Sequence, residues 1–193
     1  MKHLIILIMS IMTGFGSVAQ QEIQKTALLL IDIQEFYFPG GKWALSGPEK
    51  AAQNAALLLQ QFRQEGDLVV HVRHDTEPGG AIHSLVAPLP GEKVFTKKEV
   101  NAFRGTGLLE YLQEQGVTGL VLCGMQTHMC LEAATRAASD LGFECTVVGD
   151  ACATRDLEHE NETVKAREVH LSTLSTLKSY GTVTETRLYL NVK

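Results

Sequence analysis

The sequence predicts one α/β domain with a three-layer αβα arrangement and a doubly wound, mostly parallel sheet. Its first sign is Ala27–Ile33, an apolar run interrupted only by Asp32, as expected of a strand covered on both faces. From there on, strand-like runs alternate with helical periodicity, which specifies parallel crossovers with helices on both faces. The chain has 193 residues, 45% of them hydrophobic, and contains no linker or repeat, so we expect a single domain.

Each element is predicted from its periodicity and from the residues that end it. Pro48 in the first turn and Gly66 after the last turn bound a helix over residues 48–65, and a strand over 67–72 follows. Residues 73–104 are rich in proline and glycine, so we expect an irregular stretch that carries function. The remaining predictions are helices over 108–115, 129–141 and 160–178 and strands over 120–123, 145–148 and within 183–190.

Residues 1–19 are predicted to be a cleaved secretory signal. Lys2 precedes the apolar run Leu4–Met12, and small residues stand at the two positions that a signal peptidase reads, Ser17 and Ala19. A membrane anchor or a buried strand is the alternative, but the run is too short to span hydrocarbon. We therefore expect an exported protein, periplasmic or extracellular, with no stable membrane anchor and a mature domain over residues 20–193.

Charge and cysteine content narrow the function classes. The formal net charge of −5 provides no basic field for nucleic acid, so nucleic acid is not expected as a partner. The four cysteines are too few for the disulfide framework of a mini-protein, and Cys123 and Cys145 lie in apolar runs where a thiol packs as a small hydrophobe. Only Cys130 and Cys152 stand where a thiol could do chemistry.

Cys130 is the leading candidate nucleophile. It follows the strand-like segment 120–123 after a short turn and begins a segment with helical spacing of apolar residues. Backbone N–H groups and the dipole at a helix N-terminus favour the nucleophilic thiolate, and the same N–H groups suit an oxyanion. The alternative is a small buried residue that packs the helix.

Asp32, Lys97 and Lys98 are the candidate charged residues. Asp32 lies in an apolar run, where an ionised carboxylate is costly unless a cation or donors compensate it, although it could instead cap the turn after the strand. Lysines are usually solvated, so position alone assigns neither lysine. In a parallel sheet, ligands bind beyond the carboxyl ends of the strands, where residues 32, 73–75, 124–130 and 150–154 are expected.

Four motifs together resemble the isochorismatase-like cysteine hydrolases. They are residues 28–34, residues 94–97 ahead of 101–103, residues 124–130 and residues 149–151, and the resemblance extends over about residues 26–180. It implies a catalytic triad and two backbone oxyanion donors, formed by Asp32, Lys97 and Cys130 and by Gln126 and Cys130. It also implies a cis peptide bond between Met125 and Gln126. Lys97 is preferred over Lys98 because family members place a lysine six residues before the phenylalanine matched by Phe103.

The resemblance also implies a reaction. Asp32 would take the thiol proton, Cys130 would attack an amide, imide or carbamoyl carbon, and water would hydrolyse the thioester. Self-association is common in the family, so a homo-oligomer is expected. We further expect aromatic and turn residues to wall the pocket for the small-molecule substrate, although aromatic residues more often fill the core. They are Phe36, Tyr37, Phe38, Trp43, Asn101, Phe103, Thr127 and His128. Cys152 packs the core in the simpler interpretation and forms a redox pair with Cys130 in the alternative.

No metal or other cofactor is expected. Nicotinamidases of this family bind a metal through a closely spaced aspartate and histidine, and residues 38–55 lack that pair. His71, His74, Asp75 and His83 have no ligand-type spacing, so we interpret these histidines as solvated or capping residues.

Three other functions compete with the hydrolase. A binding protein without activity on the same fold is the chief rival, although Asp32, Lys97 and Cys130 are all present. A vinyl-ether hydrolase of the isochorismatase type is disfavoured because such enzymes lack the nucleophilic cysteine. A dinucleotide-binding oxidoreductase is disfavoured because no G-x-G-x-x-G motif follows the first strand.

Overall fold

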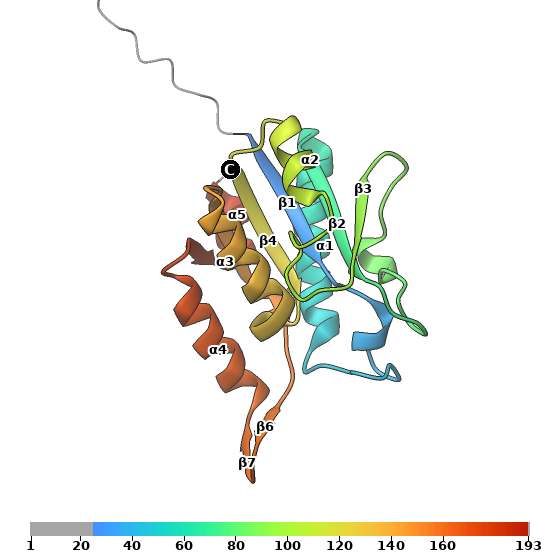
Figure 1. The fold of residues 1–193 in the computed structure, drawn as a ribbon, viewed down its shortest axis with the longest axis vertical. Coiled ribbons are helices and arrows are strands. Elements are labelled where there is room, and N and C mark those ends of the chain that lie inside the picture. The colour runs from blue at the N-terminus through green and yellow to red at the C-terminus, as the bar shows by residue number, and fades with distance from the viewer. Residues whose placement is uncertain (1–24, 193) are drawn as a thin grey trace, which may run out of the picture.

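The computed structural model describes residues 25–192 and has the predicted three-layer α/β architecture in one domain (Figure 1). The main sheet has six strands in the order β3-β2-β1-β4-β5-β8, and every neighbouring pair is parallel. In chain order these strands are β1 (Thr26–Ile31), β2 (Leu68–His74), β3 (Lys93–Lys97), β4 (Gly119–Met125), β5 (Glu144–Ala153) and β8 (Thr182–Thr184). The predicted fold class is confirmed.

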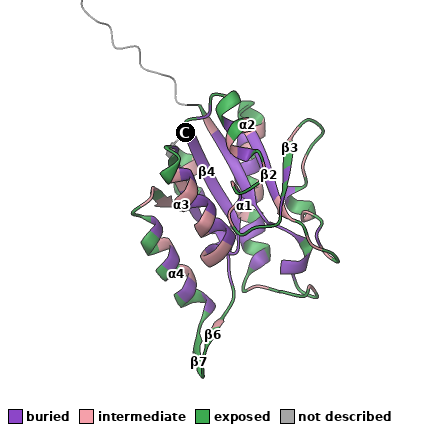
Figure 2. Ribbon diagram, in the orientation of Figure 1, coloured by how far each residue is buried: buried purple, intermediate pink, exposed green. Residues whose placement is uncertain are grey.

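Helices cover both faces of this sheet. On one face lie α1 (Pro48–Glu65) and α5 (Thr186–Val192), and on the other lie α2 (Leu108–Glu114), α3 (Glu132–Asp140) and α4 (Ala166–Leu177) (Figure 1). Short 3-10 helices span Glu35–Tyr37 and Ser84–Val86, and a π-helical turn spans Thr127–Leu131. The central strands are buried on both faces, as their continuous apolar sequences predict (Figure 2).

The point where the strand order reverses positions the candidate site. β1 pairs with β2 on one side and with β4 on the other, so the chain leaves β1 and β4 toward opposite faces of the sheet. Such a switch point opens a crevice beyond the carboxyl ends of the strands. Asp32 directly follows β1, and the turn that carries Cys130 directly follows β4.

The stretch predicted to be irregular contains a strand. β3 forms the edge of the sheet at Lys93–Lys97 and pairs with β2. An edge strand packs only partly, and here only Phe95 and Lys97 are buried, so the segment lacks the long apolar run that reveals a central strand. Phe95 packs against Tyr111 of α2, with 5.5 Å between ring centroids.

Two predictions near the C-terminus are wrong in part. The helix predicted over 160–178 begins only at Ala166, because residues 157–164 form a hairpin of β6 (Leu157–His159) and β7 (Glu162–Val164). The strand predicted within 183–190 ends at Thr184 and is followed by α5. The carboxylate of Asp150 accepts hydrogen bonds from the backbone N–H and the hydroxyl of Thr186, which fixes the first turn of that helix.

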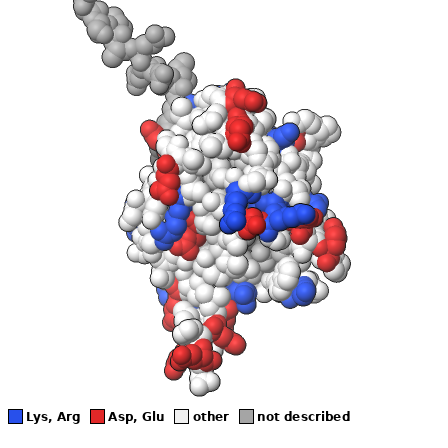
Figure 3. Space-filling model, viewed as in Figure 1, with Lys and Arg blue, Asp and Glu red and all other residues white. Residues whose placement is uncertain are grey.

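The β6–β7 hairpin projects from the body of the molecule, as Figures 1 and 2 show. Its residues are exposed except for Leu157, and acidic side chains gather on it in Figure 3. On the same view, basic and acidic side chains are interspersed over the rest of the visible face.

The predicted signal segment, residues 1–19, lies outside the described residues. Within residues 25–192, no helix has the length and apolar character needed to cross a membrane.

Candidate active site

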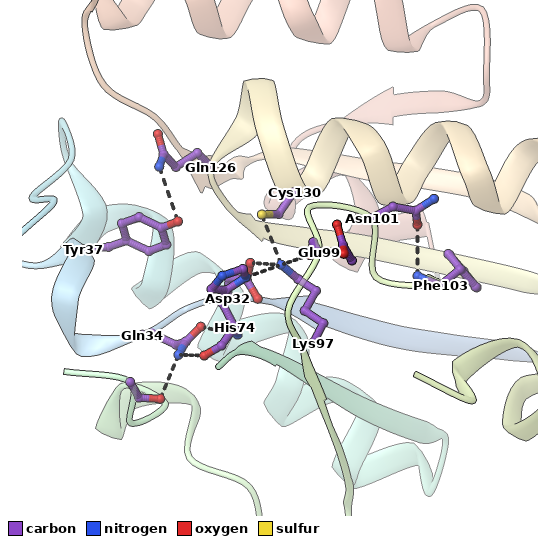
Figure 4. A network of polar contacts seen from close by, with 11 residues as sticks. Asp32, Gln34, Tyr37, His74, Lys97, Glu99, Asn101, Phe103, Gln126 and Cys130 are labelled. Carbon is purple, nitrogen blue, oxygen red and sulfur yellow. Dashed lines mark hydrogen bonds and ion pairs between the residues drawn. The ribbon is translucent and has the colours of Figure 1, made fainter. Parts of the chain in front are cut away.

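Three strands bring the predicted triad together (Figure 4). Asp32 follows β1, Lys97 ends β3, and Cys130 lies in the π turn after β4. Lys97 Nζ lies 2.7 Å from Asp32 Oδ2 and donates a hydrogen bond to Cys130 Sγ at 3.2 Å. Lys97 reaches Asp32 from two strands away in the sheet, which its long side chain allows. The three groups form one buried cluster.

Lys98, the alternative lysine, points elsewhere. Its side chain is 84% exposed, and its Nζ lies 3.9 Å from Asp75 Oδ2 on the surface. The alternation of side chains along β3 explains the difference, since successive residues of a strand face opposite directions. Lys97 therefore supplies the ammonium of this cluster.

The backbone at the ends of β1 and β4 is unusual. Asp32 has a φ of 51°, in the left-handed region that aspartate tolerates better than most residues. Gly124, which pairs with Ile31, has a φ of 128°, and a Cβ there would lie 2.0 Å from the Ile31 carbonyl oxygen. Only glycine fits this close approach of β4 to β1. The pairing of β4 with β5 shifts register between Leu122 and Gly124, just before the turn.

The turn after β4 differs from the predicted helix N-terminus. Cys130 is the fourth residue of the π turn, and α3 begins only at Glu132, so the thiol is not at the first turn of that helix. The Met125–Gln126 peptide bond is cis, as the resemblance implied. Within the turn, the backbone N–H groups of Met129 and Leu131 donate hydrogen bonds to the Gln126 carbonyl.

The surroundings of Cys130 disfavour the thiolate that a helix N-terminus was expected to favour. Burial and the charge of Asp32 raise the pKa of Cys130 to about 12, and Lys97 offsets only part of this rise. A thiol with that pKa is almost entirely uncharged near neutral pH. Nucleophilic attack therefore needs a base that removes the proton.

Asp32 is placed to be that base. Burial raises its pKa above the ordinary value, against the opposing effects of the Lys97 ammonium, the Cys130 thiol and His74. The carboxylate is fully buried. Among the described residues it forms a close ion pair with Lys97, but neither oxygen has a donor that meets the angular criteria of a hydrogen bond. A buried carboxylate with a raised pKa beside a thiol can accept the thiol proton.

A cavity of about 220 Å³ opens on the thiol. Its wall combines aromatic, apolar and polar side chains: Phe36, Tyr37, Trp43, His74, Val100, Gln126, Met129, Cys130 and Arg155. Phe36 packs edge-on against Trp43, with 5.3 Å between ring centroids, and with Tyr37 these predicted aromatic residues do form part of the wall.

The other predicted substrate contacts lie outside this wall. Phe38 stacks on His83, Phe103 stacks on Phe143, and the Asn101 side chain accepts a local hydrogen bond from the Phe103 N–H. Thr127 and His128 turn their side chains toward His170 and Thr154, with contacts of 2.9 and 2.6 Å. Their closeness to Cys130 in sequence does not place their side chains in the cavity wall, because the side chains of a turn point in several directions.

Sequence reasoning missed Val100, Met129 and Arg155 as wall residues and gave the Gln126 side chain no part in the wall. Tyr37 and Gln126 are joined by a 3.3 Å hydrogen bond from Gln126 Nε2 to the Tyr37 hydroxyl, and Arg155 Nε donates to Gln126 Oε1 at 3.3 Å. Arg155 follows β5 beside the predicted segment 150–154, so the rule on strand ends comes within one residue of it. Val100 and Met129 carry no sequence signal that separates them from ordinary core residues.

Cys152 packs in the core, as the simpler interpretation had it, whereas His71 departs from expectation. The Cys152 thiol donates to the Val148 carbonyl at 3.2 Å, lines a different cavity of about 290 Å³ and interacts electrostatically with Cys123. All four cysteines are free, and Cys130 is coupled to Asp32 and Lys97. His71 is buried and bonded to Glu92 at 3.0 Å, so it is neither solvated nor a cap, whereas His83 does cap a turn by accepting from the Leu85 N–H.

Residues 25–192 contain no group of three or more histidine, cysteine, aspartate or glutamate side chains that could hold a metal ion.

Comparison with known proteins places this geometry in a family. The model of the isochorismatase domain matches residues 26–179. The isochorismatase family protein YddQ of Bacillus subtilis, which is uncharacterised, is 48% identical over 177 residues, covering 86% of this chain and 98% of YddQ. Maleamate amidohydrolase of Pseudomonas putida KT2440 is 33% identical over 167 residues, covering 74% of this chain and 75% of that enzyme.

Solved structures agree with the sequence comparison. The crystal structure of an isochorismatase from Pseudomonas putida KT2440 superposes with a TM-score of 0.81 at 35% identity, covering 84% of this chain and 88% of the other. The shared fold and the matched domain lead to one conclusion: the chain belongs to the isochorismatase family of hydrolases.

Proposed function

We propose that this hydrolase uses Cys130 to cleave the C–N bond of a small amide, imide or carbamoyl compound. The observation that carries the proposal is the buried contact of Lys97 Nζ with both Asp32 Oδ2 and Cys130 Sγ, at 2.7 and 3.2 Å, beside a cavity. A thiol, a base and a fixed cation in mutual contact are the parts that nucleophilic acyl transfer needs. A protein that only binds its ligand has no need of this costly buried charge pair.

The first half of the reaction forms a thioester. Asp32 takes the proton of the Cys130 thiol, and the sulfur forms a bond to the substrate carbonyl carbon while the π electrons move to oxygen. The N–H groups of Gln126 and Cys130 hold the resulting oxyanion. The oxyanion then collapses, the C–N bond breaks, and Asp32 returns its proton to the leaving nitrogen.

The second half restores the thiol. Asp32 takes a proton from water, the resulting hydroxide attacks the thioester carbonyl, and the C–S bond breaks. The sulfur leaves as a thiolate and recovers the proton from Asp32, so the products are a carboxylic or carbamic acid and the free enzyme. Throughout the cycle the Lys97 ammonium stabilises whichever neighbour carries the negative charge.

The cavity supports a small substrate with oxygen acceptors. Its volume of about 220 Å³ suits a compound of few heavy atoms, and Arg155 is the one cation among its lining side chains. The relative named maleamate amidohydrolase has a name that denotes an amide with a carboxylate. Amides that carry an acidic group are therefore the first substrates to test.

The direct test is turnover of a panel that includes maleamate, succinamate, butyramide and N-carbamoylglycine. We expect hydrolysis of at least one compound, with release of ammonia, and a loss of about 10³-fold or more in C130A. C145A is the matched control, because Cys145 has the same 5% exposure as Cys130 but lies outside the cavity. Binding of panel compounds without turnover by the wild type would support an inactive binding protein instead, and equal losses in C130A and C145A would refute a special role for Cys130.

A further inference from the structure

His74 lies between the two charged members of the cluster. It ends β2, the strand between β1 with Asp32 and β3 with Lys97, and it is in register with Lys97. Its Nδ1 lies 3.3 Å from Lys97 Nζ, and its ring lines the cavity that opens on Cys130. The proposed mechanism gives His74 no role.

The backbone of His74 is held by a neighbouring side chain. The buried amide of Gln34 accepts a hydrogen bond from the His74 N–H at 2.7 Å and donates to the His74 carbonyl at 3.0 Å. The same amide also donates to the Gly80 carbonyl at 2.7 Å (Figure 4). This bidentate clamp holds the end of β2 in one position relative to β1.

The contact with Lys97 determines which nitrogen of the ring carries the proton. Lys97 Nζ also contacts Asp32 Oδ2, Cys130 Sγ and the Glu99 carbonyl, so its three N–H groups are shared among four partners. Because an ammonium has no acceptor, a hydrogen bond between Lys97 and His74 requires an Nδ1 that carries no proton. The neutral ring then carries its proton on Nε2. A protonated ring would instead direct an N–H and a positive charge at the Lys97 ammonium. His74 is thus held as the Nε2–H tautomer.

We propose that His74 is a substrate-binding residue, whose Nε2–H donates a hydrogen bond to an oxygen of the substrate and whose tautomer is set by Lys97. The proposal rests on the proposed function, since it concerns the ligand of the same cavity. Two neighbours in the wall are also donors. Arg155 is cationic, and the Tyr37 hydroxyl already accepts from Gln126, which leaves its own hydrogen to donate.

A wall rich in donors selects a substrate rich in acceptors. Burial raises the pKa of Tyr37, so its hydroxyl keeps its proton, and the acceptor oxygen of Gln126 is already used by Arg155. The substrate class that fits is an amide or carbamoyl compound with a carbonyl or carboxylate oxygen beside its scissile bond. An analogue without that oxygen would leave these donors, of which Tyr37 is buried, without a partner.

The tautomer can be measured without any substrate. We expect long-range ¹H–¹⁵N spectra of [¹⁵N]histidine-labelled protein at pH 7.5 to show His74, assigned by the loss of its signals in H74N, with a protonated Nε2 and a bare Nδ1. K97M should remove this preference. A protonated Nδ1 in the wild type, or a tautomer unchanged in K97M, would overturn the inference while leaving the proposed hydrolase reaction intact.

Kinetics of two variants then separate the two ring nitrogens. The asparagine amide of H74N reaches the Nδ1 position and keeps an acceptor for Lys97, while the longer amide of H74Q reaches the Nε2 position and keeps a donor. With the best panel amide, we expect H74N to raise KM about 10-fold or more with kcat within about 3-fold of the wild type, and H74Q to raise KM less than H74N.

Equal KM values in H74N, H74Q and the wild type would overturn the binding role of His74. A fall in kcat alone in both variants would do the same, because it would reduce His74 to a support for Lys97. Each variant must melt within a few degrees of the wild type for its kinetics to count. If H74N or H74Q fails to fold, the ¹H–¹⁵N spectra of the wild-type protein still test the inference.

Discussion

At the scale of single residues, a negative charge on Asp32 disfavours a second negative charge on Cys130. The charge on Asp32 raises the pKa of Cys130, and Lys97 lies against both groups. In the proposed mechanism Asp32 takes the proton of the Cys130 thiol when substrate arrives, so the negative charge moves from the carboxylate to the sulfur. The site therefore keeps a weakly reactive thiol until a base acts on it.

The variant D32N tests this coupling. Removing the negative charge removes one cause of the high pKa of Cys130 and leaves the Lys97 ammonium to favour the thiolate, so the pKa of the thiol should fall from about 12. We expect turnover to fall by about 10²-fold or more because the base is lost, while alkylation of Cys130 by iodoacetamide at pH 7–9 becomes faster.

Alkylation is followed by peptide mass spectrometry, with D75N as the control. Asp75 lies on the surface near Lys98, so its loss should change neither rate. Slower alkylation in D32N than in the wild type would show that Asp32 does not raise the pKa of Cys130.

At the scale of elements, the approach of β4 to β1 places the turn that carries Cys130. Gly124 permits this approach because a Cβ would overlap the Ile31 carbonyl, which belongs to the rigid core of the sheet. We expect G124A to lower the free energy of unfolding in urea by about 3 kcal/mol or more, through backbone strain and steric overlap combined.

The matched control for this variant is G142A. Gly142 also has a positive φ, of 91°, but a Cβ at this position would meet no other part of the chain within 4 Å. Only the backbone strain of about 1–2 kcal/mol therefore applies to G142A. Similar losses of stability in the two variants would mean that the contact between β1 and β4 tolerates a side chain.

Local signals predict some elements fully and others not at all. The helix over 48–65 has both predicted ends, because Pro48 and Gly66 mark them in the sequence itself. The strand β3 has few buried residues, and α5 depends on hydrogen bonds from Thr186 to Asp150, a residue 36 positions earlier in the chain. Interactions over such separations leave no trace in a local pattern.

In the candidate site, too, some features are predictable from the sequence and others depend on the folded structure. Asp32, Lys97 and Cys130 follow from motif order and from the rule that strand ends share one edge. The same rule includes His74 and comes within one residue of Arg155, but which side chains of these segments line the cavity depends on how neighbouring strands and loops direct them. The raised pKa of Cys130 depends on its burial. Neither property is readable from residue types and spacing.

At the scale of the whole molecule, the cluster of Glu92, Arg63 and His71 should make the fold sensitive to acid. Burial would raise the pKa of Glu92, but hydrogen bonds from Arg63, the Leu89 N–H and His71 outweigh it and lower the pKa to about 2. Burial lowers the pKa of His71. Both groups stabilise the fold at neutral pH and lose that effect in acid, His71 below its ordinary value of 6.5 and Glu92 between about 4.5 and about 2.

We expect E92Q to lower the free energy of unfolding by about 2 kcal/mol at pH 7 and to flatten its decline between pH 4.5 and 2. Glu132, which pairs with Arg136 within α3, provides the control variant E132Q. Urea titrations at several pH values measure both, and equal pH dependence in E92Q and the wild type would exclude Glu92 as a source of acid sensitivity.

Export stays a prediction from the sequence, and self-association stays a prediction from the family resemblance. Export is tested by finding a mature N-terminus near Gln20 in an extracytoplasmic fraction. Self-association is tested by the mass of the native particle in solution.

The central claim is that Cys130 carries the substrate as a thioester. The most direct measurement is intact and peptide mass spectrometry of protein quenched in acid during turnover of the best amide. We predict an added mass equal to the acyl or carbamoyl group on the peptide that contains Cys130, removable by hydroxylamine and absent in C130A. Turnover without an adduct on Cys130, or an adduct on another residue that persists in C130A, would contradict the account.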